Sequence, residues 1–140
     1  MPRAKARPRA RAGAASLPLQ RTPRTAILVL VAVTEPVAAV VRRGSEAARE
    51  ARLPLEIVVL APDGTTSAAC MSTMDEALHL ARSVAPELAI RAESSGLGGH
   101  PAHAGRSSSH PLVVASPQTW DTFAHRGDLR WLHAGRVEVV

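Results

Sequence analysis

The strongest constraint on the fold of this chain is an unbroken run of eight apolar residues at positions 26–33. A half-buried strand would alternate apolar with polar residues, and this run does not. A strand of this composition needs cover on both faces, which a parallel sheet receives when helices pack on each side of it. A second, largely apolar run at residues 55–61 is closed by the turn sequence Pro62-Asp63-Gly64. The two runs therefore predict buried strands of a parallel sheet.

An amphipathic helix is predicted between these two strands. Thr34 or Glu35 is placed to cap it, and Pro36 suits its first turn. Apolar residues then recur at helical spacing, at Val37, Val40, Val41, Ala47, Ala48 and Ala51. Strand, helix and strand in this order predict a right-handed βαβ unit.

A second helix is predicted after the turn. Ser72 and Thr73 each precede an acidic residue by three positions, which resembles a capping box at the start of a helix. The apolar positions that follow keep helical spacing, at Met74, Ala77, Leu78, Ala81, Val84 and Ala85. Pro86 should end this helix, and residues 88–92 are predicted to form a short third strand.

The alternation of strands and helices breaks at residues 94–109, which are rich in Gly, Ser, His and Pro. This composition predicts a loop with at most one helical turn near residues 102–105. The pattern resumes with a strand at 112–116, a helix that starts at Ser116-Pro117, carries Trp120 and Phe123 and ends by Gly135, and a last strand at 137–140. The expected fold class over residues 25–140 is therefore α/β, a doubly wound, mostly parallel, Rossmann-like five-stranded sheet with a shortened third crossover helix.

Positive charge is concentrated in residues 1–24, which hold seven Arg or Lys and no acid. The other 116 residues hold ten Arg against twelve Asp or Glu, for a net charge of −2. The basic segment has no hydrophobic period and is interpreted as a disordered tail. It is interpreted either as an arm attracted to nucleic acid or another anionic surface by counterion release, or as a solvated extension or the product of an upstream start codon. The acidic body argues against a nucleic-acid-binding domain, so any such contact is expected through the tail alone.

Other residue classes limit the function further. The single cysteine, Cys70, cannot form an internal disulfide and is interpreted as a small apolar residue on a helix packing surface. No apolar stretch reaches the roughly 18–20 residues that cross a bilayer, and no apolar signal-peptide core precedes residue 25. We therefore expect a cytoplasmic protein without a membrane segment. A zinc site at His100, His103 and His110 is disfavoured, because the loop carries no Cys or acid beside them.

Residues 27–37, ILVLVAVTEPV, resemble the opening of universal stress proteins, which run I-L-V-x-V-D-G-S-E-x-S into their first helix. Residues 112–116 are similar to the family's L-V-V-G-S fourth strand. The resemblance implies a bacterial stress-response module with the fold described above. Members of the family form homodimers through their last strand, which here implies an interface at Val137, Glu138, Val139 and Val140.

The nucleotide-binding members of that family differ from this chain at their ligand site. Their Asp at the end of the first strand is replaced here by Ala32, and the Gly and Ser that follow it by Val33 and Thr34. Their glycine-rich phosphate cradle corresponds to residues 115–123, which contain no glycine. Phosphate binding needs backbone N–H groups that a ligand can approach closely, and Pro117 and Trp120 do not supply them. The degenerate pocket positions are Ala32, Val33, Thr34, Ala115 and Ser116, and we expect no cofactor and no ATP bound through the family motif.

The expected function is a non-catalytic regulatory or stress-response binding module that acts as a homodimer and contacts a protein partner. One alternative rests on residues 94–98, SSGLG, which resemble the D-S-S-G-L-G motif of anti-sigma-factor antagonists. That resemblance implies a phosphorylatable switch at Ser94 or Ser95. The other alternative is a small nucleotide-binding enzyme. No Ser-His-Asp arrangement suitable for nucleophilic catalysis can be argued from the sequence.

Overall fold

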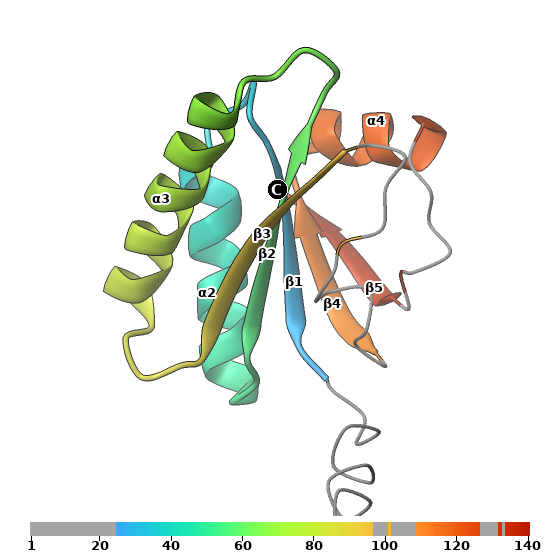
Figure 1. Ribbon diagram of the computed structural model, residues 1–140. Helices are drawn as coiled ribbons and strands as arrows, with labels where there is room; N and C mark the ends of the chain where they lie inside the picture. The colour runs from blue at the N-terminus through green and yellow to red at the C-terminus, as the bar shows by residue number, and fades with distance from the viewer. Residues whose placement is uncertain (1–24, 97–100, 102–108, 127–131, 133) are drawn as a thin grey trace, which may run out of the picture.

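The computed structural model describes residues 25–96, 101, 109–126, 132 and 134–140. Five strands form one sheet in which every pairing is parallel. They are β1 (Ile27–Ala32), β2 (Leu55–Ala61), β3 (Ile90–Gly96), β4 (His110–Ala115) and β5 (Ala134–Val139), in the order β3-β2-β1-β4-β5. The helices α2 (Ala38–Ala51) and α3 (Ser67–Val84) pack on one face, and α4 (Pro117–Arg126) packs on the other (Figure 1). This arrangement confirms the predicted doubly wound α/β fold.

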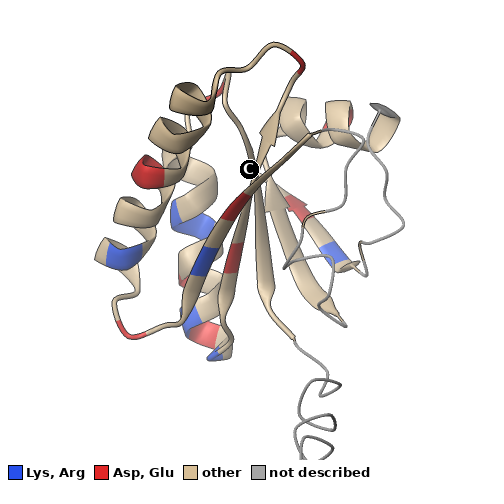
Figure 2. Ribbon diagram, viewed as in Figure 1, with Lys and Arg blue, Asp and Glu red and all other residues tan. Residues whose placement is uncertain are grey.

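The central strand β1 explains the apolar run that opens the domain. Ile27, Val29 and Val31 are buried in the core beneath α2 and α3. Leu28 and Leu30 are buried in the opposite core beneath α4. Both faces of β1 are therefore covered, and Figure 2 shows no charged residue on either β1 or its neighbour β4. Burial on both faces excludes the polar alternation of a half-exposed strand.

The first helix begins without the predicted cap. Its N-cap is Val37, which makes no side-chain capping hydrogen bond, so the assignment of Thr34 or Glu35 as the cap is wrong. Gly44 lies on the buried face of α2, where an added Cβ would stand 2.1 Å from Val29 Cγ2. The absence of a side chain at Gly44 therefore sets how closely α2 approaches β1.

The second helix begins earlier than predicted. The side chain of Thr66 caps it by accepting a 3.1 Å hydrogen bond from the Ala69 N–H, so Ser72 and Thr73 lie within the helix and do not start it. The helix ends at Val84, two residues before Pro86, as predicted. The free Cys70 is half-buried on this helix.

The third strand is longer than predicted and includes part of the expected loop. Ser94 and Ser95 pair with Val59 and Leu60 of β2, so these two serines belong to a strand. Gly96 ends this strand, and residues 97–108, with the expected helical turn, lie outside the described residues apart from Pro101. At the other end of the domain, β5 begins at Ala134, so Gly135 lies inside a strand and does not end α4.

None of the described helices is both long and apolar enough to cross a membrane. The basic segment 1–24 lies outside the described residues, and so do His100 and His103. The interpretation of the tail therefore stays a prediction.

Candidate functional site

The strand order reverses between β1 and β4, which creates the usual ligand position of an open parallel sheet. The chain leaves β1 toward α2 on one face and leaves β4 toward α4 on the other (Figure 1). Ligands of such sheets bind beyond the carboxyl ends of the strands at this point. A cavity of about 130 Å³ lies there. Its lining residues are Ala32, Thr34, Glu35, Leu60, Pro62, Gln118, Thr119 and Thr122.

The residues predicted for the degenerate pocket divide into two groups. Ala32 and Thr34 line the cavity, and Ser116 adjoins it through its hydrogen bond to Glu35. Val33 instead packs against the core on the α2 face, and Ala115 is fully buried in the core beneath α4. Three of the five predicted positions therefore meet at one site.

The Glu35 carboxylate occupies the start of α4. Its Oε1 atom accepts a hydrogen bond from Ser116 Oγ and a second, 3.0 Å long, from Thr119 Oγ1. Ser116 Oγ in turn accepts a 3.1 Å hydrogen bond from the Thr119 N–H and so caps the helix. A helix N-terminus attracts negative charge because its free N–H groups and its dipole point outward. Here that charge is supplied by the protein itself.

This role of Glu35 is not apparent from the sequence. Its position directly after a strand suggested a local cap for the next helix, whereas its partners come from α4, more than 80 residues away.

The Pro62-Asp63-Gly64 turn was predicted correctly. Gly64 has a left-handed φ of 88°, and the Thr65 N–H donates to the Pro62 carbonyl over 3.1 Å.

His110 is held in a buried pair. Its Nε2 atom lies 3.2 Å from Glu56 Oε1, and both side chains are almost completely buried. His110 is the first residue of β4 and Glu56 the second residue of β2. These strands flank β1, so the pair links strands on either side of the central one. Among the described residues no group of three or more His, Cys, Asp or Glu could hold a metal ion.

The serine pair of the alternative switch lies near the end of edge strand β3. Ser94 is exposed, and Ser95 Oγ donates to the Gly96 carbonyl over 3.1 Å. In the anti-sigma-factor antagonists this motif would open a helix, whereas here both serines are in a paired strand. Residues 97–100, which complete the motif, lie outside the described part of the chain.

The four residues predicted for the dimer interface lie at a sheet edge. Val137, Glu138 and Val139 belong to β5, which pairs with β4 on one side. Val140 follows directly, and its N–H donates to the Ala115 carbonyl.

Comparison of the chain with protein families, curated proteins and solved structures finds no match.

Proposed function

We propose that this protein is a non-catalytic regulatory binding module that works as a homodimer and does not bind ATP at the reversal of its strand order. The observation that carries the proposal is the Glu35 carboxylate, hydrogen-bonded to Ser116 and Thr119 at the start of α4. A nucleotide phosphate in that position would compete with this carboxylate and be repelled by it.

The size of the cavity supports the same conclusion. Its volume of about 130 Å³ is well below the range of roughly 300–1,000 Å³ typical of pockets for drug-sized ligands. The stretch after β4 also carries Pro117 and the capped turn of α4 where a phosphate cradle would need glycine. These features, together with the resemblance to universal stress proteins, favour the interpretation that this chain is a divergent member of that family. Such a member would retain the sheet and lack the nucleotide site.

The homodimer is proposed through the outer edge of β5. Among the described residues this edge has no neighbouring strand, so its main-chain groups are available for pairing. Val139 and Val140 are exposed apolar residues at the same edge, with 47% and 43% of their surface accessible. A second copy related by a two-fold axis would extend the sheet and cover both valines.

The ATP part of the proposal is tested by thermal unfolding in millimolar Mg-ATP. We expect no stabilisation of the wild-type chain. Glu35→Ala frees the two hydroxyls and the helix start, so this variant should be stabilised by ATP or inorganic phosphate. Glu76→Ala, at an exposed position of α3, is the matched control and should behave like wild type. Clear stabilisation of wild type by ATP would overturn the proposal and favour the small nucleotide-binding enzyme.

The homodimer is tested by light scattering of the full chain. We expect the mass of two copies for wild type and of one copy for Val139→Lys, which places a charge on the proposed contact. Ser83→Lys, at an exposed position of α3, should remain a dimer. A single-copy mass for wild type at micromolar concentration would refute this part.

A switch at Ser94 or Ser95 remains a second candidate, because Ser94 is exposed at the carboxyl end of a strand. It requires phosphate on one of the two serines in the protein isolated from its own cell. A phosphopeptide map with both serines unmodified would eliminate it.

A further inference from the structure

An uncovered groove lies on the α2 face of the sheet, at the opposite end from the Glu35 cavity. The helices α2 and α3 cover β1, β2 and β3 on this face, α2 also reaches β4, and no described helix packs over β5 (Figure 1). The groove has a volume of about 410 Å³, which falls within the range of ligand pockets. Most of its lining is apolar, from Ile27, Ala47, Ala51, Leu53, Pro111 and Leu112.

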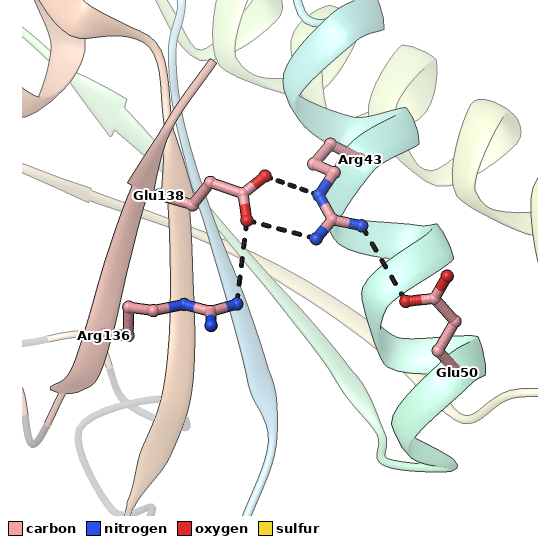
Figure 3. Close-up of polar contacts among 4 residues, drawn as sticks. All are labelled: Arg43, Glu50, Arg136 and Glu138. Carbon is pink, nitrogen blue, oxygen red and sulfur yellow. Dashed lines mark hydrogen bonds and ion pairs between the residues drawn. The ribbon is translucent and has the colours of Figure 1, made fainter.

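Three charged side chains from α2 and β5 are among the residues that line this groove and form its rim: Arg43, Glu50 and Arg136. Figure 3 shows them together with Glu138 of β5. Arg43 reaches from α2 to Glu138 on β5, with Nε 2.5 Å from Oε2 and Nη2 3.1 Å from Oε1. Both carboxylate oxygens of Glu138 are therefore engaged by one guanidinium. On its other side, Arg43 Nη1 lies 3.9 Å from Glu50 Oε1.

The guanidinium of Arg136 still has N–H groups that can donate hydrogen bonds to a ligand. Its Nη2 atom is 3.8 Å from Glu138 Oε1, which is too long for a hydrogen bond. Its side chain is 69% exposed, and it donates no hydrogen bond to the described residues. A guanidinium fork is suited to bind a carboxylate with two parallel hydrogen bonds. The groove thus combines an apolar floor with one available carboxylate-binding group at its rim.

We infer that this groove binds a small monocarboxylate with an apolar body, whose carboxylate pairs with Arg136 and whose body lies on Ile27, Leu112 and Ala51. Two acids limit the charge that can enter, because Glu50, which lines the groove, and Glu138, which is paired with Arg43, would repel a second anionic group. Dicarboxylates and phosphate esters are therefore poorer ligands than monocarboxylates. The inference does not depend on the homodimer, since the groove is on the sheet face and the proposed contact uses the strand edge.

The experiment is a calorimetric titration of the full chain with hexanoate, octanoate and decanoate below their micelle concentrations. Each methylene that enters the groove should strengthen binding about fourfold until the groove is filled. Decanol, which has the apolar body without the carboxylate, should bind about tenfold more weakly than decanoate. Equal binding of all three acids, or no binding of decanoate, would refute the inference.

Two variants locate the site. Arg136→Ala should weaken the binding of decanoate about tenfold. Arg42 is an exposed arginine on α2 outside the groove, so Arg42→Ala should leave the affinity for decanoate unchanged. Ala51→Trp fills the groove from an exposed position and should abolish binding. Unchanged binding in either groove variant would place the ligand elsewhere and overturn the assignment.

The same variants separate this inference from the proposed dimer. Light scattering should give Arg136→Ala and Ala51→Trp the same mass as wild type. A lower mass for Arg136→Ala with normal decanoate binding would assign Arg136 to the contact between copies and overturn its role here. Binding to anionic lipid vesicles without binding to free decanoate would likewise replace the small ligand with a membrane surface.

Discussion

Glu35 Oε1 and Thr119 Oγ1 lie 3.0 Å apart, although 84 positions of sequence separate their residues. The contact joins the connection after β1 to the first turn of α4, and these segments lead to opposite faces of the sheet. Ser116 adds a second hydrogen bond to the same carboxylate oxygen. The acid therefore has a structural role at the position where related sheets hold a ligand.

Glu35→Gln should destabilise the fold by about 1 kcal/mol at neutral pH. The amide keeps the shape of the side chain and loses the negative charge that favours both hydroxyl donors and the start of α4. Urea unfolding measures the difference. Glu76→Gln on the exposed face of α3 should change the free energy of unfolding by much less. Equal effects of the two substitutions would contradict the role assigned to Glu35.

The Arg43–Glu138 pair should make stability depend on acid pH. The hydrogen bond from Arg43 lowers the pKa of Glu138 below its ordinary value of 4.5. A carboxyl with a lowered pKa stabilises the fold above its ordinary pKa, and this contribution is lost as pH falls through the lower folded-state value. Because about 30% of each side chain is exposed, the expected contribution is only about 0.5–1 kcal/mol.

Glu138→Gln tests this expectation by urea unfolding at pH 7 and at pH 3. The variant should be less stable than wild type at pH 7, and the difference should shrink at pH 3 as the wild-type carboxyl becomes protonated. High salt should also reduce the difference at pH 7, since the pair is partly exposed. A difference that does not vary with pH would mean that the ionised pair does not stabilise the fold.

Gly44→Ala should destabilise the protein by about 1–2 kcal/mol, although alanine is the better helix former. The new Cβ would stand 2.1 Å from Val29 Cγ2, and overpacking of this kind costs about 1–3 kcal/mol. The gain in helix propensity of about 1 kcal/mol offsets part of that cost. In the Gly44→Ala background, Val29→Ala should cost less than it does alone, because it relieves the clash. Additive effects in that double-mutant cycle would argue against direct contact.

Glu56→Ala should lower the free energy of unfolding by about 3 kcal/mol, because it removes one partner of a buried pair and leaves His110 in the core. The double variant Glu56→Leu, His110→Leu removes both polar groups and should be more stable than the sum of its single substitutions predicts. Thermal and denaturant unfolding both report the comparison. A loss below about 0.5 kcal/mol in Glu56→Ala would show that the pair contributes little.

The parts of the fold that were predictable from sequence depend on local composition. The strand at residues 55–61 was predicted with the bounds that the structure shows, because its largely apolar run is closed by the turn Pro62-Asp63-Gly64. The parallel sheet followed from strands too apolar to leave a face in water. The end of α3 was marked by Pro86, which cannot continue a helix.

The errors arose where the deciding partner is distant or the local pattern is weak. Ser94 and Ser95 were assigned to a loop because their polarity is typical of loops, yet an edge strand tolerates polar residues on its open side. Thr66 starts α3 within a run of small residues that has no helical period of its own. The partners of Glu35 come from the other half of the domain, so no local pattern could identify them.

The central position of β1 has a consequence for how the chain folds during synthesis. Leu28 pairs with a residue of the neighbouring β2, and also with Val113 of β4, 85 positions later. A ribosome releases the β1-α2-β2 unit long before β4 exists. The backbone edge of β1 that later pairs with β4 therefore has no neighbouring strand while most of the domain is made. Pairing over such a sequence separation is slow because the loop entropy is lost before the contact is gained. The nascent chain is therefore most exposed to aggregation and to chaperone capture in the interval between the synthesis of β2 and that of β4.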